Sequence, residues 1–84
     1  MATIQHAERK LEKWAGTVSA SSSPAFKLVA EKSGVVIEVG GRDEADLIRV
    51  RQSSERDDAR TDYCAGTWCD TVAAAIRMAD RIAG

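Results

Sequence analysis

The feature that most constrains this chain is its C-terminal stretch Tyr63–Ala83, which predicts a short strand, a Gly-Thr turn and an amphipathic helix. On a 3.6-residue wheel, Asp70, Ala74, Arg77 and Arg81 fall on one side and apolar residues on the other. A helix with one apolar face must pack that face against a sheet or another helix. The apolar face comprises Val72, Ala75, Ile76, Ala79, Ile82 and Ala83.

A second helix is predicted over residues 3–16. Thr3 suits an N-cap, and Gly16 can supply the left-handed residue that ends a helix. Like charges four residues apart, such as Glu8 and Glu12, make this helix weaker than the C-terminal one. Its apolar positions at helical spacing are Ile4, Ala7, Leu11, Trp14 and Val18.

The segment after the first helix predicts a β-hairpin. Phe26–Glu31 alternates between two faces, and Val35–Val39 is rich in the β-branched residues that suit a sheet. Residues 32–34 between them form a turn, in which Gly34 can take a positive φ.

Two further strands are predicted, Leu47–Gln52 and Thr61–Ala65, with Gly66–Cys69 turning into the C-terminal helix. Serine-rich residues 17–25 are interpreted as a flexible connector, and polar residues 53–60 as an exposed, mobile loop.

The resulting order α-β-β-β-β-α predicts an α+β fold, a two-layer sandwich formed by a single domain over residues 1–84. Successive strands with short connections usually pair as an antiparallel meander. The C-terminal helix is expected on one face of the sheet, and the first helix either joins it or covers part of the other face. The face that receives the C-terminal helix is predicted to carry Phe26, Leu28, Val35, Ile37, Val39, Ile48 and Val50.

Composition narrows the classes of function. The 12 basic and 13 acidic residues give a formal net charge of −1, whereas a protein that coats DNA usually carries an excess of cations. The chain has no apolar run of the roughly 18–20 residues needed to span a bilayer. It has no apolar core of a secretory signal and only two cysteines, which favours a reducing, cytoplasmic setting.

Cys64 and Cys69 are the most chemically suggestive pair. Cys69 precedes a helix, where amide groups can lower a thiol pKa. Their spacing is C-x4-C, however, and His6 lies on a different helix, so neither a redox motif nor a metal site is recognisable. Structural cysteines are favoured over a thiol enzyme, and no enzyme activity, metal or cofactor is predicted.

Arg49 and Arg51 alternate on the third strand and therefore project from one face of the sheet, with Lys27 alongside. Such arginines can contact phosphates, or they can form cross-strand ion pairs with Glu31 and Glu38. Ion pairing is the preferred interpretation.

Two charged loops, residues 40–46 and residues 53–60, are interpreted as solvated rather than catalytic, because nothing indicates the burial that would shift their pKa values. In a meander they emerge at opposite ends of the sheet. They remain candidates for contact with a partner, and together with the strand arginines the candidate partner-binding residues are Arg42, Asp43, Glu44, Arg49, Arg51, Arg56, Asp57 and Asp58.

The two tryptophans are predicted to have packing roles. Trp68 is expected to pack against the C-terminal helix as a staple, and Trp14 continues the apolar stripe of the first helix. A tryptophan on a sparsely covered surface would instead be a natural binding anchor.

The segment Gly66–Thr71, followed by the alanine-rich helix, resembles the strand-to-helix ending of AP2-type DNA-binding domains and of HicB-like antitoxins. The helix and strand order is also similar to that of double-stranded-RNA-binding domains, although Asp70 and Thr71 stand where those domains have a basic helix start. The first likeness covers about a quarter of the chain, and packing geometry demands its turn glycine, helix cap and alanines in many families. No family is assigned.

The sequence therefore predicts a small non-enzymatic protein-binding module. The classes considered are a phage-type inhibitor of host machinery, of the kind that anti-CRISPR proteins represent, and an adaptor. The alternative is a nucleic-acid-binding domain that uses Arg49 and Arg51. A homodimer is possible, since two helices need not cover both faces of the sheet.

Overall fold

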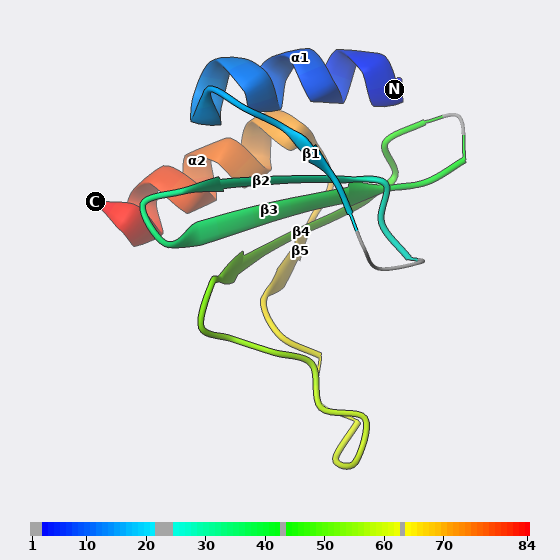
Figure 1. Ribbon diagram of the computed structural model, residues 1–84, viewed down its shortest axis with the longest axis vertical. Helices are drawn as coiled ribbons and strands as arrows, with labels where there is room; N and C mark the ends of the chain where they lie inside the picture. The colour runs from blue at the N-terminus through cyan, green and yellow to red at the C-terminus, as the bar shows by residue number, and fades with distance from the viewer. Residues whose placement is uncertain (1–2, 22–24, 43, 63) are drawn as a thin grey trace.

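The computed structural model describes residues 3–21, 25–42, 44–62 and 64–84. One antiparallel sheet has the strand order β1-β2-β3-β4-β5, and both helices lie on the same side of it (Figure 1). The predicted α+β sandwich and antiparallel meander are therefore confirmed. The elements are α1 (Ile4–Ala15), β1 (Ser19–Ala20), β2 (Leu28–Lys32), β3 (Val35–Gly40), β4 (Leu47–Gln52), β5 (Thr67–Cys69) and α2 (Val72–Ala83).

Both helices begin at threonine caps. The N–H of His6 donates to Thr3 Oγ1 at 3.1 Å, and the N–H of Ala74 donates to Thr71 Oγ1 at 3.1 Å. Each bond satisfies a backbone donor that the first turn of a helix leaves unpaired. At the other end of α1, Gly16 has a φ of 87° and donates its N–H to Glu12 O, as predicted.

The hairpin between β2 and β3 has the turn that its sequence predicts. Lys32 pairs with Val35, and the two residues between them, Ser33 and Gly34, have φ values of 53° and 78°. Two consecutive positive φ values are typical of the turn whose twist matches that of the flanking strands.

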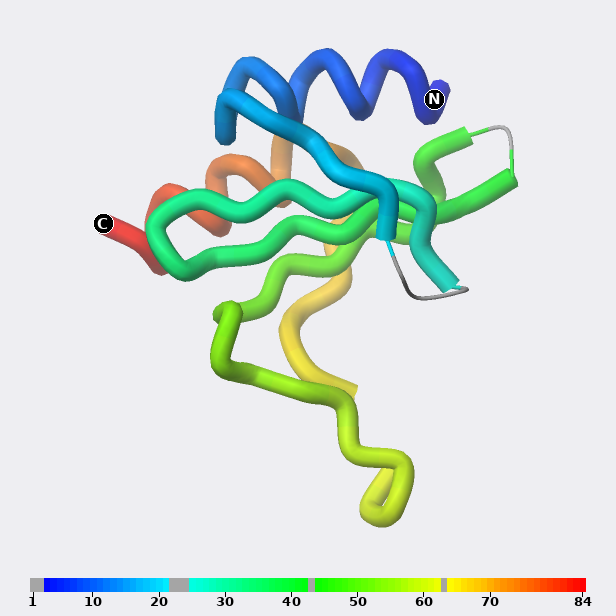
Figure 2. Tube along the Cα trace, in the orientation of Figure 1, coloured from blue at the N-terminus to red at the C-terminus, as the bar shows by residue number. Residues whose placement is uncertain are grey.

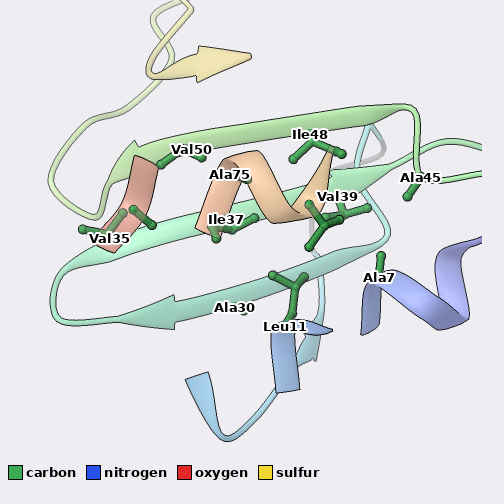
Figure 3. Packing of buried hydrophobic residues seen from close by; sticks show 12 residues of the cluster. Ala7, Leu11, Ala30, Val35, Ile37, Val39, Ala45, Ile48, Val50 and Ala75 are labelled. Carbon is green, nitrogen blue, oxygen red and sulfur yellow. The ribbon is translucent and has the colours of Figure 1, made fainter. Parts of the chain in front are cut away.

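The core lies between the sheet and the two helices. Ala75 of α2 and Ala7 and Leu11 of α1 are fully buried (Figure 3), and Ala79 of α2 is fully buried as well. Alanines bring the helix axes close to the sheet, so that the β-branched side chains fill the space between the layers. The sheet contributes Ala30, Val35, Ile37, Val39, Ile48 and Val50 to this cluster.

Trp14 joins the two helices. It is partly buried against the core, and its Nε1–H donates to Asp80 Oδ1 on α2 at 2.9 Å. Its predicted packing role is thus accompanied by a polar contact. Helix α1 joins α2 on one face, and no helix formed by the described residues lies on the other face of the sheet. No helix in the described parts of the chain is both long and apolar enough to cross a bilayer.

The sheet differs from prediction at both edges. The presumed connector contains β1, and the last strand is Thr67–Cys69 rather than Thr61–Ala65. Of the predicted fourth strand, Tyr63 lies outside the described residues, and Thr61 and Asp62 form a turn in which Asp62 has a φ of 55°. The polar residues 53–62 form an arm that leaves β4 and extends from the body of the molecule (Figure 2).

Two aromatic residues lie on the opposite face from the one predicted. Phe26 precedes β2 instead of belonging to it, so the alternation of β2 does not fix its direction. Trp68 is the register partner of Arg49 and shares that residue's face, so it does not pack on α2. This is a correction to both expectations.

Candidate functional site

A row of side chains crosses the uncovered face of the sheet. Val29 pairs with Glu38, Glu38 with Arg49, and Arg49 with Trp68. Directly paired residues project to the same side of an antiparallel sheet, so all four point away from the helices. Glu38 and Arg49 are only 5% and 6% exposed, whereas Trp68 is 52% exposed.

The charges in this row form a compact network. Glu38 Oε1 accepts hydrogen bonds from Arg49 Nε at 3.0 Å, Arg49 Nη2 at 2.9 Å and Arg51 Nε at 2.8 Å. Arg49 Nη1 also donates to Asp57 Oδ1 at 2.8 Å. The expected cross-strand ion pairs with Glu38 are therefore present, whereas Glu31 makes no ion pair with the described residues, and Asp57 of the arm adds a second carboxylate.

The network shifts two pKa values. Burial lowers the pKa of Arg49, but hydrogen bonds and charges from Glu38 and Asp57 outweigh that effect and raise it overall. The pKa of Asp57 is lowered, first by the hydrogen bond from the N–H of Ala65 and then by the guanidinium of Arg49. Arg49 and Asp57 are thus both held in their charged forms near neutral pH.

Aromatic rings cover the network. Phe26 and Trp68 stack with ring centroids 5.9 Å apart and 20° between their planes. The guanidinium carbon of Arg49 lies 4.9 Å from the centroid of Phe26 and 5.9 Å from that of Trp68, within the range of cation–π attraction. These three residues are called the Phe26–Trp68–Arg49 cluster below.

A glycine brings Phe26 to this place. A Cβ atom on Gly40 would lie 2.4 Å from the carbonyl oxygen of Ala25 and 3.1 Å from Cα of Phe26. The backbone at Ala25 and Phe26 can therefore pass over β3 at this point only because Gly40 has no side chain.

Beside the cluster, the uncovered face is hollowed into a trough. It consists of two adjoining hollows of about 460 and 300 Å³, which share Val29, Arg51 and Arg56. Residues 17–21 border one side and residues 53–57 of the arm border the other. Its floor and sides include Val29, Glu31, Val36, Glu38, Arg49, Arg51, Glu55, Arg56 and Asp57.

Four of the candidate partner-binding residues meet at this face: Arg49, Arg51, Arg56 and Asp57. Arg51 Nη1 donates to the carbonyls of Gln52 and Glu55, at 3.2 and 3.0 Å, and Arg56 Nη1 donates to the carbonyls of Ser53 and Glu55.

The remaining candidates lie elsewhere. Arg42 and Glu44 are exposed on the β3–β4 loop at the opposite end of the sheet, as the meander predicts. There, Glu44 forms a β-bridge with Thr3, and the carbonyl of Arg42 accepts a hydrogen bond from Lys27 Nζ. Asp58 is exposed on the arm and accepts the N–H of Arg60, and Asp43 lies outside the described residues.

The cysteines do not form an activated pair. Burial and the neighbouring Asp70 raise the pKa of Cys69, so its thiol stays protonated at neutral pH rather than forming the reactive thiolate. Cys64 is exposed, and both thiols are free. No group of three or more potential metal ligands is found within the described ranges.

Sequence reasoning found the arginines of this site but not its aromatic part. Placing the last strand at residues 61–65 put Trp68 in a turn, from which it was expected to pack on the C-terminal helix. The available signal was the β-favouring triplet Thr67–Cys69 directly before the Thr71 cap.

Comparisons of the chain with family models, with curated proteins and with solved structures find no match in any of the three. A functional proposal therefore rests on the geometry of the uncovered face.

Proposed function

We propose that this chain is a small non-enzymatic protein-binding module that contacts its partner through the uncovered face of the sheet. The observation that carries the proposal is Trp68, which is 52% exposed although its ring is held by Phe26 and Arg49. Tryptophan and arginine are the residues most enriched where binding energy concentrates in protein interfaces.

Rigidity adds to the effect of exposure. Arg49 is fixed by Glu38 and Asp57, and Trp68 is stacked on Phe26, so little side-chain freedom remains to be lost on binding. Ordering a mobile side chain at an interface costs roughly 0.5–1.5 kcal/mol. A preorganised aromatic anchor avoids much of that cost.

The nucleic-acid alternative has less support. Arg49 and Arg51 already donate to Glu38, and a phosphate group would have to compete with that carboxylate. The formal net charge of −1 supplies no general attraction for a polyanion.

The biological consequence of binding would depend on the partner. We propose a cytoplasmic setting, which suits the two free thiols. Inhibition of a host machine, as by anti-CRISPR proteins, and assembly as an adaptor are then distinguished by assaying the captured partner with and without this chain.

The test is a quantitative capture experiment with two matched variants. Trp68→Ala removes the proposed anchor. Ile82→Ala removes a large apolar side chain that is 44% exposed on α2, in the helical layer. The wild type and I82A should retain a partner from host lysate in stoichiometric amount. W68A should bind the purified partner at least ~30-fold more weakly, the equivalent of about 2 kcal/mol.

Three results would overturn the proposal. W68A could bind the partner as tightly as wild type, or no protein could be retained at stoichiometry. The third is salt-dependent binding to duplex DNA or RNA that is lost in the Arg49→Ala, Arg51→Ala double variant, which would establish the alternative.

A further inference from the structure

Glu38 has a second carboxylate oxygen whose situation differs from that of the first. All three arginine hydrogen bonds fall on Oε1, and Oε2 has no hydrogen-bond partner in the described chain. Among the described residues, no side-chain oxygen that is closed to solvent lacks a partner, so Oε2 remains accessible. Glu38 lines the smaller hollow of the trough, and Oε2 therefore faces that hollow although the side chain is only 6% exposed.

A second carboxylate lies nearby on the same face. Val36 is the register partner of Glu31, and Glu38 follows Val36 by two residues, so the two glutamates occupy diagonal positions. Such positions lie about 7–8 Å apart. Glu31 is exposed and lines the larger hollow, and its side chain makes no hydrogen bond or ion pair with the described part of the chain.

The polar groups of the trough favour a cationic ligand. Four carboxylates line it, from Glu31, Glu38, Glu55 and Asp57, against the three guanidinium groups of Arg49, Arg51 and Arg56. Those guanidinium groups donate to carboxylates and carbonyls of the chain itself. Among the described carboxylates of the trough, Glu38 Oε2 and Asp57 Oδ2 accept no hydrogen bond from the chain, and the carboxylate of Glu31 accepts none at either oxygen.

The spacing of these acceptors selects an extended peptide. Alternate side chains of an extended chain point the same way and are about 6.6–6.8 Å apart, which matches the diagonal spacing of Glu31 and Glu38. Val29 and Val36 lie between the two glutamates in the register and offer an apolar surface to the methylene stems of long basic side chains.

We propose that the trough binds an extended segment of the partner protein that carries basic residues at alternate positions. One basic side chain pairs with Glu38 and the next with Glu31. Arg49 belongs to both the trough and the Phe26–Trp68–Arg49 cluster, so the flanking part of the partner reaches Trp68. This inference rests on the proposed function and specifies the partner's chemistry.

The test uses capped five-residue peptides and NMR titration of the full chain. Acetyl-Ala-Arg-Ala-Arg-Ala-amide places both arginines on one side of an extended backbone. Acetyl-Ala-Arg-Arg-Ala-Ala-amide has the same charge but places them on opposite sides, and acetyl-Ala-Glu-Ala-Glu-Ala-amide reverses the charge. The alternating basic peptide should shift the amide signals of Val29 and Val36 saturably and bind at least threefold more tightly than the adjacent one.

Two protein variants locate the contact. Glu31→Gln removes one proposed negative charge without breaking any described contact, and it should weaken binding of the alternating peptide about three- to tenfold. Glu8→Gln removes an exposed carboxylate from α1, in the layer of helices on the other side of the sheet, and should leave the affinity unchanged. Raising the salt from 0.05 to 0.5 M should weaken binding, because ion pairs at an accessible surface are screened.

Equal affinity for the two basic peptides, preference for the acidic peptide, or no saturable shift with any of them would overturn the inference. These failures are separable from failure of the proposed function. If a partner is still captured through Trp68, the protein-binding module stands and only the basic segment is lost.

Discussion

Asp57 holds two parts of the chain through a single carboxylate oxygen. Its Oδ1 accepts from Arg49 Nη1 on β4 at 2.8 Å and from the N–H of Ala65 at 2.9 Å. Most of the arm is exposed and polar, and segments with few buried apolar contacts open easily. The two hydrogen bonds accepted by Asp57, called the Asp57 contact from here on, thus fix the position of the arm beside the trough.

Replacing Asp57 with alanine should remove both hydrogen bonds and free the arm. We expect the amide of Ala65 to exchange with solvent at least tenfold faster, because its acceptor is removed and Ala65 is buried. The control is Asp58→Ala, since among the described residues the side chain of the neighbouring Asp58 accepts only the local N–H of Arg60. Hydrogen exchange followed by NMR would measure the protection of the Ala65 amide in both variants. Similar protection in the wild type and D57A would refute the role of the Asp57 contact.

The same contact should depend on pH. The pKa of Asp57 is lowered in the folded chain from the ordinary 3.8, so the unfolded state takes up a proton before the folded state does. The contribution of Asp57 to the unfolding free energy is therefore fully present when the pH is above the ordinary pKa. It is lost as the pH falls from that value through the lowered pKa of the folded chain. The difference in unfolding free energy between the wild type and Asp57→Asn should shrink as the pH is lowered from 5 to 2.

At the scale of elements, local signals sufficed where propensity and turn chemistry agreed. Val35–Gly40 and Leu47–Gln52 are strands within one residue of prediction. Local signals failed to predict β1 and β5. These are short edge strands that form by pairing with β2 and β4. Neither short segment contains enough residues to show an alternation, so tertiary context decides their structure.

A substitution at Gly40 tests whether the close approach of Ala25 and Phe26 to β3 holds Phe26 in place. Adding a methyl group by Gly40→Ala would bring Cβ to 2.4 Å from the carbonyl oxygen of Ala25, which forces the backbone to move. We expect a loss of about 1–3 kcal/mol in unfolding free energy, the usual cost of overpacking. Increased exposure of Trp68 should be seen in the fluorescence of a Trp14→Phe background, where Trp68 is the only tryptophan.

Gly16→Ala separates crowding from backbone strain. Gly16 has a positive φ of 87°, yet nothing lies within 4 Å of a Cβ atom placed there. This variant should lose about 1 kcal/mol without any change in Trp68 fluorescence. Unchanged stability and fluorescence in Gly40→Ala would show that Phe26 is not held by this crossing.

For the whole molecule, the sequence allowed two positions for α1, on either face of the sheet, and its amphipathic pattern fits both. The decision depends on long-range contacts, the burial of Ala7 and Leu11 beside α2 and the bond from Trp14 to Asp80. The candidate site also depends in part on these long-range contacts. Its arginines and their ion pairs followed from alternation along β4, whereas the trough exists because both helices occupy the other face.

Leu11→Ala tests whether α1 is an integral part of this single layer. Leu11 is fully buried, and deleting such a side chain costs about 2–5 kcal/mol. That is a large share of the 5–15 kcal/mol that stabilises a typical domain. Trp14→Phe, which removes the bond to Asp80 but keeps an aromatic ring, should cost only about 0.5–1.5 kcal/mol.

Because α1 packs on both β2 and α2, Leu11→Ala should lower the midpoint of one cooperative transition in urea. In a Trp14→Phe background, where Trp68 is the only tryptophan, far-UV circular dichroism and Trp68 fluorescence should change together. An early loss of helical signal with the fluorescence transition unshifted would instead mean that α1 detaches alone. The uncovered face and its trough would then persist without α1, and the two faces of the sheet would be energetically independent.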